Sequence, residues 1–344
     1  MCDISALHYW RTRSDAIGTS SGRVNAAPSR RSHPSIDIPT SATIKYLDSL
    51  GFVQDGEVSL LVSSPADRRV LKNTKVTVIG AEVPSRSFVR ALGQVYVVSP
   101  ELLFVMAASK LSFPRLLELG HELCGTYRMT SPHPTYNVEP LTSVAALRSY
   151  AQKAKGIRGR RSALLACKYI ADDSASPAET ALSIMFRLPL RYGGYGLGMP
   201  LLNHELTLNE TASRLLGGRG AIKPDFYWAA ARYPAEYDSS LYHSTREQSD
   251  VDERRRNAYA ALGMGVTVVR PRHLCQIELL DGIAASVCKN TGIKTYHLPA
   301  DYRALHESLF QEVCRYWTEL HDRYPGAQDY LLESAAYSGP EGQW

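Results

Sequence analysis

The sequence lacks the features that mark several large classes of protein. Its six cysteines are scattered and form no CxxC pair, which argues against a zinc site and against a disulfide framework. No stretch approaches eighteen uninterrupted apolar residues, and the first dozen residues carry charges instead of the apolar core of a secretory leader. No Gly-x-Ser-x-Gly elbow supports acyl-transfer chemistry. We therefore expect a cytoplasmic protein with reduced thiols and no membrane partner.

Strong charge of either sign is also lacking. The 39 lysines and arginines nearly balance the 34 aspartates and glutamates, which leaves a formal net charge of +5. This bias permits contact with a polyanion but does not require it. A hydrophobic content of 44% and a charged content of 21% are typical of a globular chain, and 344 residues are enough for two compact units.

Composition divides the chain into four predicted parts. Residues 1–42 are expected to form a flexible N-terminal arm, because much of this segment is rich in Ser, Pro, Gly and Arg without any period. Alternating helix and strand patterns predict a small α/β domain over 43–150 and a second α/β domain over 151–298. Residues 299–344 are expected to supply a C-terminal helix and a tail.

A basic run separates the two predicted domains. Six lysines and arginines and no acid lie between Arg148 and Arg161. Such a run is typical of a solvated linker or helix face, and a phosphate-binding patch is the alternative. The nearby GGYGLG stretch at 193–198 is interpreted as a loop, because it lacks the strand-to-helix setting of a dinucleotide-binding motif.

The most informative stretch gathers three carboxylates and an imidazole. Pro224-Asp225 is followed by Glu236-Tyr237-Asp238 and then by His243. Strand alternation places Glu236 and Asp238 on one face, and a neighbouring strand would bring Asp225 beside them. Two like charges about 4 Å apart repel by about 4 kcal/mol at an effective dielectric near 20, so this cluster needs a proton or a cation. A hard divalent ion that prefers oxygen ligands suits it.

Each of these residues also has an ordinary structural explanation. Acids on an exposed sheet edge protect against aggregation, and a lone histidine is commonly a surface or core residue. Glu179 follows Pro177 in the first turn of a predicted helix, where the helix dipole favours an acid. Asp252 is spaced for a helical ion pair with Arg255 or Arg256, and the alternative is a supporting role beside His243.

The order of these groups resembles that of a known superfamily. Glu179 on a helix, Pro224-Asp225 and Glu236-x-Asp238 on two strands, and then a helix and a strand resemble the PD-(D/E)XK restriction-endonuclease-like superfamily. Within it, DFYW, EYD and DERRRNAYAALGMGVTVVR look like the branch related to very-short-patch repair endonucleases. The upstream RSFVRALGQVYVVSPELLFVMAA is similar to the C-terminal domain of type IV abortive-infection antitoxins.

The resemblance implies a fold, a cofactor and a set of site residues. It implies a mixed sheet flanked by helices, and Mg2+ (or Mn2+) bound by Asp225, Glu236 and Glu179. The implied catalytic residues are Asp225, Glu236, Asp238 and His243. Arg254, Arg255 and Arg256 are candidates for weak bidentate contacts to DNA phosphates, and a solvated helix face is the alternative for them. Asp238 stands where the superfamily usually has lysine, so another cation must replace that lysine or the domain has lost activity.

Two functions follow as expectations. The first is a metal-dependent endonuclease that hydrolyses DNA phosphodiester bonds in defence or repair, with DNA and a toxin or repair component as partners. The second is a catalytically inactive nuclease-fold or antitoxin-like regulatory protein that binds DNA.

Overall fold

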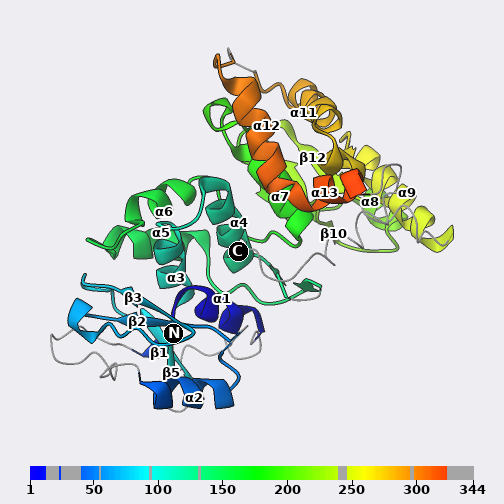
Figure 1. Ribbon diagram of the computed structural model, residues 1–344. Coiled ribbons are helices and arrows are strands. Elements are labelled where there is room, and N and C mark those ends of the chain that lie inside the picture. Colours follow the sequence, from blue (N-terminus) through cyan, green and yellow to red (C-terminus); the bar gives the residue numbers. More distant parts are fainter. Residues whose placement is uncertain are drawn as a thin grey trace. The chain divides into compact units, whose positions relative to one another are not determined.

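The computed structural model has a mixed α/β architecture, as the sequence predicts (Figure 1). It describes residues 1–12, 23–24, 40–53, 56–92, 95–130, 133–238, 246–294 and 298–323, with the backbone alone at 23–24, 246–249 and 320–323. The chain forms two compact units. Of the described residues, the first contains those of Met1–Cys124 and Val138–Lys168, and the second contains those of Gly125–Asn137 and of 169–323. The chain thus enters the second unit at Gly125, returns to the first at Val138 and enters the second again at Tyr169, whereas the sequence predicted one boundary after residue 150.

The described residues of the first unit form two small sheets and six α-helices. Strand β2 (Val58–Val62) pairs in parallel with β3 (Thr74–Val78), and β4 (Phe88–Leu92) pairs with β1 (Arg23–Val24) and β5 (Val95–Val98). A short 3-10 helix, η3 (Pro65–Asp67), follows β2. The helices are α1 (Asp3–Thr12), α2 (Ser41–Ser49), α3 (Pro100–Ala107), α4 (Phe113–Cys124), α5 (Val144–Lys153) and α6 (Arg160–Ala166).

Helix α3 is the centre of this unit. Its first seven residues, Pro100 to Met106, are buried, as a helix that is apolar on nearly all sides requires. Ser99 accepts a hydrogen bond from the backbone N–H of Leu102 at 3.3 Å and caps the helix, and Pro100 occupies its first position.

The N-terminal segment differs from the expected flexible arm. Residues 3–12 form helix α1, in which Tyr9 and Trp10 are buried. The indole of Trp10 donates to the Val98 carbonyl at 2.9 Å, and the Tyr9 ring lies 6.1 Å from that of Phe52. Aromatic side chains therefore fix this segment to the unit. The rest of the predicted arm, apart from 23–24 and 40–42, lies outside the described residues.

The second unit is built on a four-stranded mixed sheet. Its strands are β8 (Leu201–Leu202), β11 (Phe226–Trp228), β12 (Tyr233–Tyr237) and β13 (Thr267–Val269), in the order β13-β12-β11-β8. Strand β11 is antiparallel to both neighbours, whereas β12 and β13 are parallel. A parallel pair needs a crossover, which α9 (Arg246–Ala261) supplies between these two strands.

Further helices and strand pairs complete this unit. The helices are α7 (Pro177–Arg187), α8 (Glu210–Leu215), α10 (Pro271–Cys275), α11 (Ile277–Thr291), α12 (Tyr302–Val313) and α13 (Arg315–Arg323), with 3-10 turns η4 (Leu190–Tyr192) and η5 (Ala229–Ala231). The short strand pairs are β6 (Tyr127–Arg128) with β7 (Thr135–Tyr136) and β9 (Leu206–Thr207) with β10 (Ala221–Ile222).

Aromatic packing joins α7 to the sheet. The Phe186 ring on α7 lies 5.5 Å from Phe226 and 5.9 Å from Trp228 on β11. All eleven residues of α7 are buried, which fixes the position of Glu179 in its first turn. The helix that carries one predicted site residue therefore belongs to the core.

The GGYGLG stretch is a loop against α12. Gly193 has φ +82°, and a Cβ atom there would lie 2.4 Å from the Leu305 carbonyl oxygen. His306 is buried, with Nδ1 2.6 Å from the Gly193 carbonyl and Nε2 3.0 Å from Asp281 Oδ1. These contacts make α12 part of the second unit, and the loop interpretation is consistent with this packing.

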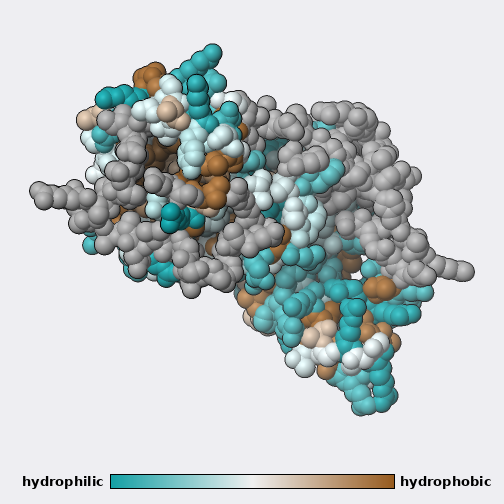
Figure 2. Space-filling model, turned by 90° about the horizontal axis from the view of Figure 1, so that it is seen from below, coloured by the Kyte–Doolittle hydropathy of each residue, from teal (hydrophilic) through white to brown (hydrophobic). Residues whose placement is uncertain are grey.

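The described surface mixes polar and apolar groups. Figure 2 shows brown hydrophobic groups among teal and white ones on the described part of one face. Exposed large apolar side chains such as Val70, Met199 and Leu298 are scattered along the sequence. Among the described helices, none has both the length and the apolar character needed to cross a membrane.

Candidate functional site

Two of the predicted carboxylates lie on neighbouring strands. The register of β11 and β12 pairs Phe226 with Ala235, so Asp225 and Glu236 follow as the next pair and point to the same face. The Asn203 N–H donates to the Asp225 carbonyl at 3.2 Å and extends the pairing toward β8. The sheet thus brings together two acids that are eleven positions apart in the sequence.

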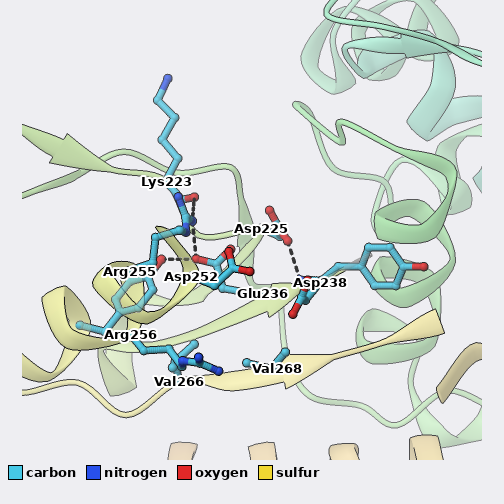
Figure 3. A pocket seen from close by; sticks show the side chains of 11 residues that line it. Lys223, Asp225, Glu236, Asp238, Asp252, Arg255, Arg256, Val266 and Val268 are labelled. Carbon is cyan, nitrogen blue, oxygen red and sulfur yellow. Dashed lines mark hydrogen bonds and ion pairs between the residues drawn. The ribbon is translucent and has the colours of Figure 1, made fainter. Parts of the chain in front are cut away.

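Both acids line one pocket of about 340 Å³ (Figure 3). Its acidic lining residues are Asp225, Glu236, Asp238 and Asp252, and its basic ones are Lys223, Arg255 and Arg256. The other lining residues are Tyr237, Tyr259, Val266 and Val268. The volume is in the range of small-ligand sites, and the mixed charge suits a ligand that carries both a cation and an anion.

Two donors from α9 hold Glu236. The Arg255 guanidinium Nη2 lies 2.5 Å from Glu236 Oε1, and the Tyr259 hydroxyl donates to the same oxygen (Figure 3). Arg255 also donates to the Lys223 carbonyl at 3.1 Å. Burial opposes the charged form of Arg255, but the attraction of Glu236 prevails and raises the pKa of the guanidinium. Burial and the Glu236 charge also raise the pKa of Tyr259, which therefore stays protonated and donates.

Asp225 is the most strongly perturbed acid of the pocket. Burial, followed by repulsion from Glu179 and Glu236, raises the pKa of its carboxyl well above the usual value. The backbone N–H of Tyr237 donates to Oδ2 at 2.5 Å and opposes this rise. A cation placed in this pocket would oppose this rise, because an opposite charge nearby favours the ionised carboxylate.

Glu179 serves a capping role and also faces the site. Ser176 Oγ accepts from the Glu179 backbone N–H at 3.1 Å and donates to Oε1 at 3.0 Å. Its Oε2 accepts from the Asn203 amide at 2.8 Å. Burial still raises the pKa of Glu179 above its usual value, and Glu236 adds repulsion. The helix-start interpretation is thus confirmed, and Glu179 also interacts electrostatically with Asp225 and Glu236.

The remaining predicted residues fall into three groups. Asp238 lines the pocket, and its N–H donates to the Val269 carbonyl at 2.8 Å. Arg255 and Arg256 line the pocket, whereas Arg254 is exposed and is not among the lining residues. His243 lies outside the described residues.

Three contributors were missed by the reasoning from sequence. Tyr259 and Lys223 line the pocket, and Asn203 holds Glu179. Tyr259 lies four residues after Arg255, the spacing that places two side chains on one helix face, so this signal was present. Asn203 has no comparable signal, because its contact depends on the pairing of β8 with β11.

The donor chemistry fits a hard cation, although the ligands are not gathered in advance. Within the described parts of the chain, no three His, Cys, Asp or Glu side chains form a group that could hold a metal ion. Arg255 and Tyr259 both bond to Oε1 of Glu236. Carboxylates such as those of Asp225 and Glu236, which are half-buried, are nevertheless the oxygen ligands that Mg2+ and Mn2+ prefer.

Sequence and structure comparisons supply no further guide to this site. The chain matches no protein-family model, no curated protein and no solved structure.

Proposed function

We propose that the second unit is a restriction-endonuclease-like domain that hydrolyses phosphodiester bonds of DNA with the help of Mg2+ or Mn2+. The observation that carries the proposal is the pocket in which Asp225 and Glu236, from adjacent strands, face Arg255 and Arg256. Carboxylates suit a metal ion, and guanidinium groups suit a phosphate. A phosphodiester with a bound metal ion needs both.

The order of elements also supports this proposal. Helix α7 carries Glu179, Asp225 directly precedes β11, Glu236 lies on β12, and α9 and β13 follow. This is the order on which the resemblance to the PD-(D/E)XK superfamily rests. This order was predicted from residue spacing, and the described elements follow one another in the same order.

Each pocket residue then has a role. Asp225 and Glu236 would hold the metal ion, which lowers the pKa of a bound water and offsets charge on the phosphate. Asp238 lines the same pocket as Glu236 and would accept the proton of the attacking water. Arg255 and Arg256 supply the positive charge that the superfamily usually draws from lysine at position 238.

A second function is favoured by one specific contact. Arg255 and Tyr259 both bond to Glu236, so this carboxylate has partners without any metal ion. A nuclease-shaped domain in that state would bind nucleic acid phosphates without cleaving them, as an antitoxin-like regulator does. This alternative predicts binding that is insensitive to chelators.

Nicking of supercoiled plasmid tests the two functions against each other. We expect cleavage with Mg2+ or Mn2+, none with EDTA, and a loss of at least about 10³-fold in Asp225→Asn, because several kcal/mol of metal stabilisation are removed. The matched control is Glu210→Gln, which changes an exposed acid paired with Arg214 on α8. If the wild-type protein binds DNA but never nicks it, or if both variants cleave equally, the hydrolytic function is wrong.

A further inference from the structure

The first unit contains a surface of unbalanced positive charge. From Leu141 to Ala171 the sequence has seven lysines and arginines and no aspartate or glutamate. Two of the seven form hydrogen bonds to backbone carbonyls. Arg148 donates to the Cys167 carbonyl at 2.7 Å, and Arg160 donates to the Ala151 carbonyl at 3.0 Å. These two contacts tie α5 and α6 together. They do not account for the other five cations.

Four of the remaining cations form what we call the basic turn, at the α5–α6 connection. The basic turn consists of Lys153, Lys155, Arg158 and Arg161. All four side chains are exposed, and among the described residues no ion pair engages any of them. Proteins usually intersperse the two signs of charge on a surface, because like charges repel. A concentration of one sign is therefore a feature that a polyanion can use.

The backbone of the basic turn is held in place. Ala154 and Ile157 alternate with the cations and are buried, at 0% and 5% exposure. Gly159 has φ +93°, and a Cβ atom there would lie 2.2 Å from the Val105 carbonyl oxygen on α3. Only glycine permits this approach, so the turn is packed against the central helix of the unit. The cations are thus presented on a fixed backbone, which lowers the entropic cost of binding.

We propose that the basic turn binds the phosphate backbone of nucleic acid, at a surface distinct from the carboxylate pocket of the second unit. The choice of nucleic acid among polyanions rests on the proposed function. An anionic membrane is disfavoured because the apolar residues of the turn, Ala154 and Ile157, point inward and offer nothing to insert between lipids. Contacts of this kind add affinity without base specificity.

Binding in EDTA tests this proposal separately from cleavage. A labelled 20-base-pair duplex is titrated by fluorescence anisotropy with the wild-type protein and with Lys153→Gln/Lys155→Gln/Arg158→Gln/Arg161→Gln. We expect the quadruple variant to bind at least tenfold more weakly at 150 mM salt. The slope of log K against log salt should fall by about 3 to 4, because each lost phosphate contact removes about 0.9.

A charge-matched variant is the control. Lys45, Arg68, Arg69 and Lys72 are exposed residues of the same unit, and their change to Gln removes the same net charge. We expect this control to bind within about threefold of the wild type, since net charge alone acts weakly at this salt. Circular dichroism establishes that both quadruple variants are folded.

Three outcomes would overturn the inference. They are equal losses in the two quadruple variants, no binding of the duplex by the wild-type protein, and binding to anionic phosphatidylserine vesicles in place of the duplex. Failure of the nuclease proposal has a different signature, because the duplex would still bind through the basic turn while the plasmid stays intact.

Discussion

The two units of the protein bury carboxylates in different ways. In the first unit, Glu122 is buried against Arg11, with paired contacts of 2.8 Å and 2.7 Å. In the second unit, repulsion from Glu179 and Glu236 raises the pKa of Asp225, and among the described residues of this cluster an ion pair joins Arg255 to Glu236. A buried acid with its own cation stabilises a fold. Several neighbouring acids with fewer cations than carboxylates, and with raised pKa values, are typical of a ligand-binding or catalytic site.

Removal of the arginine from an ion pair should lower the free energy of unfolding most at the buried Arg11–Glu122 pair of the first unit. We expect Arg11→Ala to lower the free energy of unfolding by about 3 kcal/mol, because Glu122 loses a bidentate partner in a buried position. Urea denaturation at pH 7 measures this loss. Arg214→Ala, which breaks an exposed pair with Glu210, should cost less than about 0.5 kcal/mol. Equal losses in the two variants would remove the contrast between buried and exposed pairs.

Neutralisation of an acid should have opposite effects in the two units. Asp225→Asn removes a repelled charge, so we expect the free energy of unfolding to rise by about 1 to 2 kcal/mol while metal-dependent nicking is lost. Glu122→Gln removes the charge that pairs with Arg11 and should lower the free energy of unfolding by about 2 kcal/mol. Thermal denaturation without divalent ions distinguishes the two. A destabilised Asp225→Asn protein would show that Asp225 is structural.

The pH dependence of stability should follow the same contrast. The pKa values of Asp225 and Glu179 are raised in the folded state. Between the usual carboxyl pKa and these raised values, the folded state therefore binds more protons than the unfolded state. Their contribution therefore decreases as the pH rises from about 4, the usual carboxyl pKa, through the raised folded values. Denaturation series from pH 4 to 8 should show this slope in the wild type and a shallower one in Asp225→Asn. A slope of opposite sign that Asp225→Asn leaves unchanged would contradict the assignment.

The smallest effect is expected at Tyr259. Tyr259→Phe removes one hydrogen bond to Glu236 and keeps the ring, so we expect a loss of about 1 kcal/mol in stability. Nicking should fall about fivefold, because Glu236 is held less firmly. The control is Tyr46→Phe, since Tyr46 is 47% exposed. If the two variants nick plasmid equally well, Tyr259 does not position Glu236.

Much of this comparison could be predicted from the sequence, and some could not. Alternation and spacing placed Asp225 beside Glu236, because strand geometry is local and periodic. The same reasoning missed the Arg255–Glu236 pair and instead expected Arg255 to bond within its own helix. That pair depends on where a crossover helix packs, which no local pattern contains. Strand β9 ends at Thr207 for a local reason, since Asn209 caps α8 two residues later.

The basic run illustrates the same limit. Composition left a solvated linker and a phosphate patch as open alternatives for 148–161. The structure separates the members of the run, because Arg148 and Arg160 bond to helix carbonyls while four other cations remain exposed. Which of these cations bond to a carbonyl and which stay exposed depends on how α5 and α6 pack, and composition does not contain this information.

The position of each strand in the sheet has a consequence for how long the parts of the site persist. Strand β12 has neighbours on both sides, whereas β8 is an edge strand of two residues. Amide hydrogens of β12 should therefore exchange with solvent among the slowest in this unit, and those around Asn203 much faster. If the edge frays, Glu179 loses its Asn203 amide partner but keeps its contacts to Ser176 and to the Ala175 N–H, while Asp225 and Glu236 stay in register. The site thus combines a durable pair of acids in the pocket with a neighbouring acid whose hydrogen bonding varies.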